Sequence, residues 1–220
     1  MTDLGWLVVW LAVLSIGIGG CLLLAQLGVR TTYVRDLLHV GTGVWVLGWP
    51  EWRGSVAPVL LPFVALLVVS LVPRLHNRWA RAFVSSVSDA DERFDGLVGY
   101  TGSYAALTLA AFWLGPFPAA AGLLALSLGD GVGGAIGRRF GKHHFRVPGA
   151  KEKSLEGSLA VLVAAALGVL IASARFGVHV GVVGVVLLGA SAAVAEALSP
   201  KSSDNVVVPA VVWGLTRVLL

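Results

Sequence analysis

Hydrophobic residues occur in long runs along this chain, and polar residues are confined to the short segments between those runs. Apolar runs of roughly twenty residues are typical of α-helices that span a lipid bilayer. A shorter run, Leu37–Trp49, could be a tilted span, a re-entrant segment or a helix packed inside the bundle. The pattern predicts an all-α polytopic transmembrane helical bundle with seven or eight spans. The seven long runs are Gly5–Leu27, Val56–Val72, Leu97–Leu114, Phe117–Ala135, Gly157–Ala174, Gly177–Leu198 and Val206–Leu220.

Composition supports one membrane domain over residues 1–220. Hydrophobic residues make up 57% of the chain and charged residues 13%, about half the charged share of a soluble domain. No polar segment is long enough to form a separate soluble core. The first apolar run is too long for the core of a signal peptide and has no basic residue before it, so we expect it to be a helix of the mature protein. A single cysteine, Cys21, excludes an intramolecular disulfide.

The positive charges predict an orientation. All of the sixteen Lys and Arg residues except Arg53, Arg175 and Arg217 fall in alternate loops, on one side of an eight-span bundle. Basic loops face the cytosol, so both termini are predicted on the non-cytosolic side. The net charge of +4 is confined to short loops beside membrane segments, which favours contact with membrane lipids and argues against nucleic acid as a partner.

Asp130 is the first candidate for chemistry, because it lies in an otherwise apolar run. A charged side chain at that depth costs roughly 2.5 kcal/mol or more, which makes a functional role the first hypothesis. If the helix continues past Asp130, Gly134, Gly137 and Gly141 share its face. Backbone without side chains would let phosphate groups approach, and Asp130 would bind Mg²⁺. Alternatively, these glycines allow tight helix packing in lipid.

A basic loop follows the glycines. Orientation and attraction to anionic lipid explain part of its charge. Ser154, Glu156 and Ser158 then open the next apolar run, so a helix N-terminus would direct its positive end to the place where the lysines lie. Glu156 could equally be an ordinary N-terminal helix acid. The cations considered for binding are Arg138, Arg139, Lys142, Lys151 and Lys153.

Other polar residues are expected at the same membrane face. Glu196 lies near the end of an apolar run, and Asp204 with Asn205 opens the last one, which would add carboxylates at this level. Asp204 alone could be a helix N-cap. Arg35 and His39 are four residues apart and share a helix face. A lone histidine in such a position is more often structural than catalytic.

Taken in order, these motifs resemble the CTP-dependent membrane kinases of isoprenoid alcohols, namely the phytol, farnesol and dolichol kinases. The CTP-dependent diacylglycerol kinase is similar, and the phosphatidate cytidylyltransferases are more distant relatives. Asp36 departs from the pattern, because the family often has a basic residue there. The motifs are Arg35-x-x-x-His39-x-x-x-Gly43, Gly129-Asp130-x-x-Gly133 with Gly137-Arg138-Arg139-Phe140-Gly141, Lys153-Ser154-x-Glu156-Gly157-Ser158, Glu196-Ala197-Leu198 with Asp204-Asn205-x-x-x-Pro209, and, more weakly, Gly96-x-x-Gly99-Tyr100.

The resemblance implies transfer of the γ-phosphate of CTP, with Mg²⁺, to the hydroxyl of a membrane isoprenoid alcohol at the cytosolic face. UTP or ATP as donor stays open. The lipid tail would lie between apolar helices and enter from the bilayer. The implied catalytic residues are Asp130, Lys153, His39, Glu156 and Glu196, with His39, Glu156 or Glu196 as proton acceptor. The implied metal ligands are Asp130, Glu196 and Asp204. The implied nucleotide contacts are Gly133, Gly134, Gly137, Arg138, Arg139, Lys142, Ser154, Ser158, Asp204, Asn205 and Arg35.

Three other functions fit parts of the pattern. A CTP-dependent diacylglycerol kinase would differ only in its acceptor. A lipid-phosphate cytidylyltransferase would share the nucleotide and the metal but release pyrophosphate. A small ion-coupled transporter could use the same carboxylates as an ion relay, although its charges would not be expected to gather at one face. The pattern determines neither which alcohol is the acceptor nor the oligomeric state.

Overall fold

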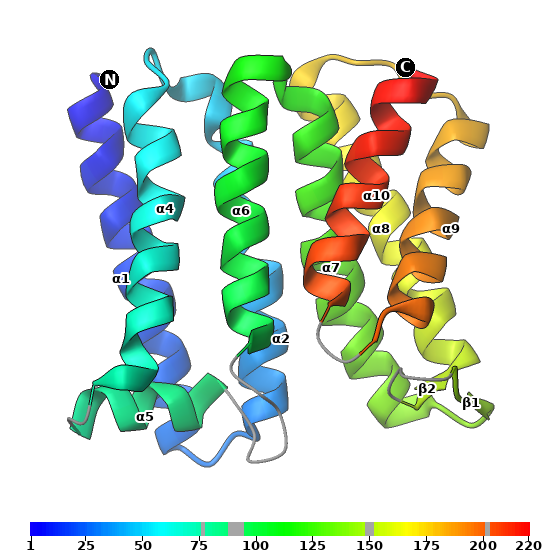
Figure 1. Cartoon of the computed structure of the whole chain (residues 1–220), viewed down its shortest axis with the longest axis horizontal. Helices are drawn as coiled ribbons and strands as arrows, with labels where there is room; N and C mark the ends of the chain where they lie inside the picture. Colours follow the sequence, from blue (N-terminus) through cyan, green and yellow to red (C-terminus); the bar gives the residue numbers. More distant parts are fainter. Residues whose placement is uncertain (76–77, 88–94, 148–151, 201–202) are drawn as a thin grey trace.

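The structure, a computed structural model of the whole chain, describes residues 1–75, 78–87, 95–147, 152–200 and 203–220. The helices stand side by side and run between two ends of the molecule (Figure 1). Both chain termini lie at one end, and helix α5 and a short β-hairpin lie at the other (Figure 1). The helices are α1 (Asp3–Gln26), α2 (Thr31–Thr42), α3 (Val44–Leu47), η1 (Trp49–Glu51), α4 (Val56–Leu71), η2 (Val72–Arg74), α5 (Arg78–Val87), α6 (Asp95–Leu114), α7 (Pro116–Phe140), α8 (Leu155–Phe176), α9 (Val182–Leu198) and α10 (Asp204–Leu219).

The predicted helical membrane bundle is confirmed, whereas the predicted number of spans is not. Five helices of the described chain are long and apolar enough to cross a bilayer: α1, α4 together with η2, α6, α7 and α8. Helix α9 is apolar but has only 17 residues, and α10 has 16. Helix α8 ends where Gly177 takes a left-handed conformation with φ of 65°. Helix α9 begins at Val182, later than the apolar run suggested.

The run Leu37–Trp49 does not form one continuous helix. Helix α2 ends at Thr42, and α3 follows after Gly43. Trp45 and Trp49 are buried in the core, in contact with other aromatic rings. The segment packs against α7 with one face, whereas Leu37 and Val44 on its other face are about half exposed.

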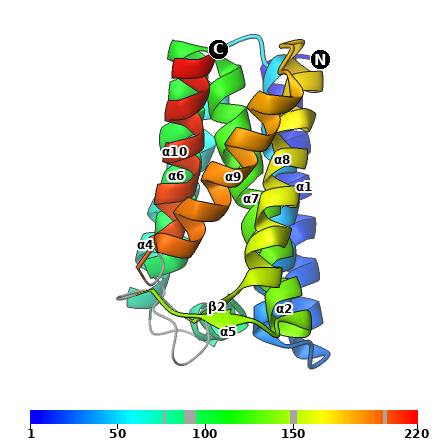
Figure 2. The same ribbon diagram turned by 90° about the vertical axis from the view of Figure 1, so that its right-hand side faces the viewer.

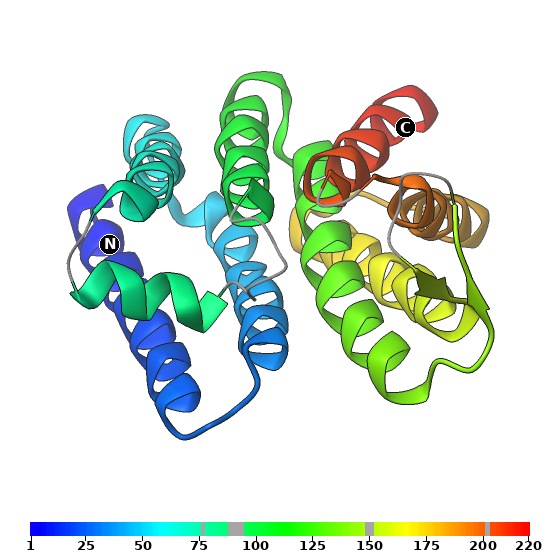
Figure 3. The same ribbon diagram turned by 60° about the horizontal axis from the view of Figure 1, so that its bottom comes forward.

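Helix α7 is the central helix of the molecule. It packs on α8, α10, α2 and α6 (Figure 3), and 67% of its most apolar 18-residue stretch is buried. Small residues make this close packing feasible in an apolar bundle. A Cβ at Gly122 would lie 2.6 Å from the carbonyl oxygen of Pro209 in α10, and one at Gly168 in α8 would lie 2.7 Å from the backbone of Leu124.

A small β-hairpin connects α7 to α8 and is an addition to the all-α prediction. Strand β1 (His144–Phe145) pairs antiparallel with β2 (Lys153–Ser154), and Phe145 lies opposite Lys153. Helix α8 starts directly after β2, so the hairpin determines where Lys153 enters the bundle.

Candidate active site

Three carboxylates from three helices meet near one end of the bundle. Asp130 comes from α7, Glu196 from the last turn of α9 and Asp204 from the first turn of α10. One oxygen from each lies within 4.8 Å of the other two. The site is at the end opposite the two termini, where α9 ends and α10 begins (Figure 1).

Lys153 of β2 supplies a cation to this carboxylate cluster. Its Nζ contacts the Glu196 carboxylate and lies 3.7 Å from Oδ2 of Asp204. Burial disfavours the charged ammonium, but Glu196 and Asp204 outweigh burial and raise the pKa of Lys153 above its ordinary value of 10.5. Lys153 is therefore a stable cation at neutral pH and is unsuited to accepting a proton. Three carboxylates and one ammonium leave a net charge of −2 on these four side chains.

His39 of α2 connects the cluster to a network of buried hydroxyls. Its Nδ1–H donates a 2.7 Å hydrogen bond to Oδ2 of Asp130, and the residue is only 3% exposed. The imidazole ring stacks on Tyr100 of α6, with ring centroids 4.1 Å apart and planes 11° apart. Tyr100 also donates to the backbone carbonyl of His39 (3.0 Å). The ring is thus held from two sides and presents a fixed donor to Asp130.

The hydroxyls behind His39 satisfy one another. The Tyr100 hydroxyl lies 2.6 Å from Thr42 Oγ1 and 3.2 Å from Ser127 Oγ, and Tyr104 lies 2.5 Å from the same serine. Fully satisfied buried networks of this kind hold their members rigidly. Apart from Tyr100, which belongs to the weakest motif, these residues were not identified from the sequence. The spacing of four between the two tyrosines, on one face of α6, was the available signal.

Arg138, expected at the nucleotide, is engaged elsewhere in this structure. Its guanidinium pairs with the carboxylate of Asp36 in α2 and lies 5.6 Å from the ring centroid of Tyr33. Asp36 therefore has a role in this chain, since it connects α2 to α7. Arg35, next to it, acts electrostatically on both Asp36 and Asp130.

The glycines after Asp130 do not form one continuous open face that a phosphate group could approach. Helix α7 does continue past Asp130, as the expected approach of phosphate required. However, a Cβ at Gly133 would lie 2.3 Å from Cγ2 of Val161, and one at Gly137 would lie 3.4 Å from the Cα of Gly157. Both glycines pack against α8, which is the alternative interpretation of this pattern. Gly134 is turned toward Arg138 instead.

Gly141 also faces the start of α8. A Cβ there would lie 2.8 Å from Oγ of Ser154. This serine caps α8 by accepting a 3.1 Å hydrogen bond from the backbone N–H of Gly157. Ser154 thus has a capping role in the described structure, and its contact with a nucleotide stays a prediction.

Glu156 lies apart from the carboxylate cluster. Its carboxylate accepts hydrogen bonds from the backbone N–H groups of Lys142 (3.0 Å) and His143 (3.3 Å) and lies 2.7 Å from Nδ1 of His143. Glu156 therefore fastens the hairpin to the first turn of α8, as an N-terminal helix acid would. The side chains of Arg139 and Lys142 are exposed at this end.

Two predicted site residues carry unused hydrogen-bonding capacity. Among the described residues, Ser158 Oγ and Asn205 Oδ1 are buried without a partner. The amide nitrogen of Asn205 donates to the carbonyl oxygen of Gly96 (3.0 Å), which connects α10 to α6. Most buried polar atoms have a partner, so these two oxygens are compatible with contact to a bound ligand.

Comparison with known proteins gives one relative of nearly the same length. The chain is 31% identical over 217 residues to the phytol kinase of Synechocystis sp. (strain ATCC 27184 / PCC 6803 / Kazusa), which covers 93% of this chain and 88% of the relative. No protein-family model matches the chain. No solved structure matches it. Identity at this level over most of both chains shows that the protein belongs to the isoprenoid-alcohol kinase family that includes phytol kinase.

Proposed function

We propose that this protein transfers the γ-phosphate of CTP to the hydroxyl of a membrane isoprenoid alcohol of the phytol, geranylgeraniol or polyprenol type. The observation that carries the proposal is the cluster of Asp130, Glu196, Asp204 and Lys153 at one end of an apolar bundle. The phytol kinase relative supports an alcohol acceptor on an isoprenoid tail. CTP as the donor rests on the motif resemblance, and UTP or ATP would be alternative donors.

The carboxylate cluster fits the binding of Mg²⁺. Magnesium in proteins is typically held by one or two carboxylates together with phosphate oxygens of the substrate. Asp130, Glu196 and Asp204 offer oxygens close enough to share one ion, and their excess negative charge favours a divalent cation. A bound Mg²⁺ would neutralise charge on the phosphates. Lys153, which stays protonated, would bind a phosphate oxygen beside it.

The proton of the alcohol needs an acceptor within hydrogen-bond reach. Lys153 is excluded because its pKa is raised, and Glu156 is committed to the hairpin. His39 and Glu196 remain. Because the Nδ1–H of His39 already donates to Asp130, we propose that His39 mainly orients this carboxylate, as partners of metal ligands commonly do.

We also propose an eight-span arrangement in which the cluster faces the cytosol. In this arrangement the three spans beyond the five long helices are α2 together with α3, then α9, and then α10. Arg53, Arg175 and Arg217 lie at the end of the bundle that holds the termini, where they contact Asp3, Glu51 and Leu114 respectively. The other basic residues would then flank the cytosolic face; of these, Arg93, Lys151 and Lys201 lie outside the described residues.

The decisive experiment is a transfer assay on purified protein in detergent with Mg²⁺. CTP labelled on the γ-phosphate is offered with phytol, geranylgeraniol, farnesol, a polyprenol and diacylglycerol, and UTP and ATP are offered in parallel. We expect a labelled prenyl monophosphate, and loss of transfer in Asp130→Asn. The matched control is Asp95→Asn, at the exposed start of α6.

Labelling CTP on the α-phosphate distinguishes the alternatives. When a lipid phosphate is also offered as acceptor, label from the α-position in a CDP-lipid, with release of pyrophosphate, would indicate cytidylyl transfer and contradict the proposal. Transfer only to diacylglycerol would contradict the isoprenoid acceptor. If no nucleotide binds at all, an ion-coupled transporter becomes the better interpretation.

A further inference from the structure

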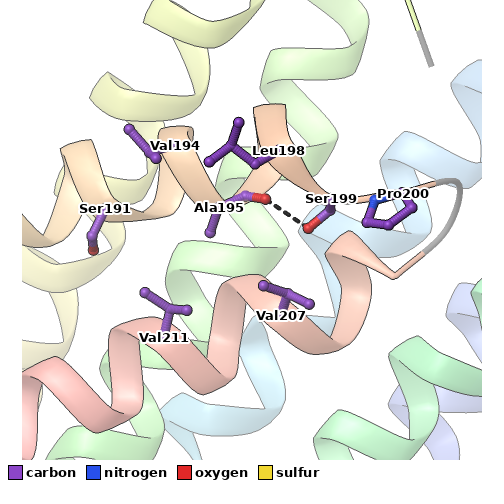
Figure 4. Close-up of a pocket in the computed structure, with 8 residues that line it drawn as sticks. All are labelled: Ser191, Val194, Ala195, Leu198, Ser199, Pro200, Val207 and Val211. Carbon is purple, nitrogen blue, oxygen red and sulfur yellow. Dashed lines mark hydrogen bonds between the residues drawn. The ribbon is translucent and has the colours of Figure 1, made fainter. Parts of the chain in front are cut away.

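We propose that the groove between α9 and α10 binds the hydrocarbon tail of the acceptor alcohol. This inference rests on the proposed function and adds the location of the lipid. The groove has a volume of about 370 Å³, within the range of roughly 300–1,000 Å³ usual for small-molecule pockets. It lies where the C-terminal half of α9 faces the start of α10 (Figure 4).

The walls of the groove suit hydrocarbon and offer nothing to a polar headgroup. Val194, Leu198, Val207 and Val211 contribute aliphatic side chains (Figure 4). Two serines also line it, but their hydroxyls donate to carbonyl oxygens of their own helix, at 2.8 Å for Ser191 and 2.6 Å for Ser199. A polar group placed there would lose its hydration without gaining a partner.

The groove is open to the outside of the bundle. Val194 and Leu198 are each 57% exposed, on the surface that would face lipid in the proposed membrane arrangement. Helix α9 crosses obliquely between α10 and α8 (Figure 2). A hydrocarbon chain could therefore enter sideways from the bilayer without displacing a helix.

One end of the groove adjoins the carboxylate cluster. Ala195, which lines the groove, directly precedes Glu196, and Val207 lies about one helical turn after Asp204. A tail held here would place a terminal hydroxyl at the level of the two carboxylates. An uncharged hydroxyl can approach them without the charge repulsion that the headgroup of an anionic phospholipid would meet. The charges at this end therefore favour an alcohol over an anionic phospholipid.

Filling the far end of the groove tests the inference. Val211 lies seven residues beyond Asp204, about 10 Å along the helix, so Val211→Trp should leave the chemistry intact. We expect this variant to raise the KM for phytol about tenfold, with little change in the KM for a short-chain prenol or for CTP. The matched control, Val218→Trp, lies on the same helix outside the groove and is 82% exposed. An unchanged KM for phytol in Val211→Trp would overturn the proposal.

A photoreactive phytol analogue, with a diazirine at the tail end, tests binding without catalysis. We expect cross-links to peptides of α9 and α10, competed by phytol and weakened in Val211→Trp but not in Val218→Trp. Cross-links confined to other helices, or competition by phospholipid as strong as by phytol, would overturn the proposal. If the wild type cross-links in the groove but transfers no phosphate to any alcohol, the proposed function fails and the groove assignment stands.

Discussion

His39 and Asp130 come from different helices, and their hydrogen bond joins the carboxylate cluster to the hydroxyl network around Tyr100. A histidine in this position can serve as a donor that orients the carboxylate or as a proton acceptor through its other nitrogen. The two roles require different atoms of the ring. A substitution that retains only one of these atoms therefore separates them.

We expect His39→Asn to retain most activity and His39→Ala to lose about 10–100-fold, the usual cost of removing a residue that orients a metal ligand. The asparagine amide can place an N–H near the position of Nδ1 but cannot replace the second ring nitrogen. The measurement is kcat together with the Mg²⁺ concentration that gives half activity. Equal, complete loss of kcat in both variants, with unchanged Mg²⁺ dependence, would instead identify His39 as the proton acceptor.

Lys153 leads to a pH prediction. Its pKa is raised in the folded protein by Glu196 and Asp204, so the stabilisation from these ion pairs is fully present below the unfolded pKa of 10.5 and is lost only as pH rises through the higher folded value. We expect kcat/KM for CTP to show no alkaline decline from Lys153 between about pH 7 and 10. Lys153→Gln should lower this ratio about 100–1,000-fold throughout that range.

The control for this prediction is Lys153→Arg, which keeps a cation with a still higher pKa. An alkaline decline that is present in the wild type and absent in Lys153→Arg would show that Lys153 titrates within the working range. That result would also reopen its exclusion as the proton acceptor.

The contact between α7 and α8 depends on glycines. From the sequence alone, these glycines could serve either helix packing or the approach of a phosphate group. Gly133 meets Val161, and Gly137 meets Gly157, at distances that leave no room for a ligand between the two helices. Their role is therefore tested by stability rather than by binding.

Gly133→Ala should lower the free energy of unfolding by about 1–3 kcal/mol, because its Cβ would overlap Val161 and force the helices apart. Gly134→Ala is the matched control, since its new methyl group would meet the flexible end of the Arg138 side chain rather than the side chain of Val161 in α8. Adding Val161→Ala to Gly133→Ala should recover part of the loss. The measurement is thermal unfolding in detergent; unchanged stability with abolished CTP binding would favour a phosphate contact at Gly133 instead.

The hairpin shows how a short connection positions a functional residue. The Glu156 carboxylate accepts hydrogen bonds from the backbone N–H groups of Lys142 and His143. The strand pairing places Phe145 opposite Lys153. With the two strands paired in this way, Lys153 lies where its ammonium group contacts the carboxylate of Glu196 on α9. The sequence pattern implied a catalytic role for both Glu156 and Lys153; their partners in the structure separate them.

For the molecule as a whole, orientation in the membrane is the main prediction. In a variant with Cys21→Ala, single cysteines at Thr2→Cys and His144→Cys report the two ends of the bundle. We expect a membrane-impermeant maleimide to label the first in intact cells and the second only after permeabilisation, because basic loops stay in the cytosol. The opposite labelling pattern would place the carboxylate cluster on the wrong side for cytosolic CTP.

The helical membrane bundle and its principal helices follow directly from the amino-acid pattern. Apolar length is a property of each segment alone, because every backbone polar group in a bilayer must be satisfied within its own helix. The boundaries of α1, α4, α6, α7 and α8 accordingly lie close to the predicted runs. Asp130, Glu196 and Asp204 could be singled out in the same way, since a carboxylate in or beside an apolar run is conspicuous without any partner.

Partnerships between distant residues were decided only when the helices packed. Arg138 pairs with Asp36, Glu156 binds the hairpin and Gly133 faces α8, although the sequence pattern had implied nucleotide contacts for Arg138 and Gly133 and a catalytic role for Glu156. The break at Gly43 likewise depends on how α2 and α3 fit against α7. A side chain's type limits what it can bind, but which neighbour it meets depends on the rotation and crossing of helices, and these are set by close packing of the whole bundle.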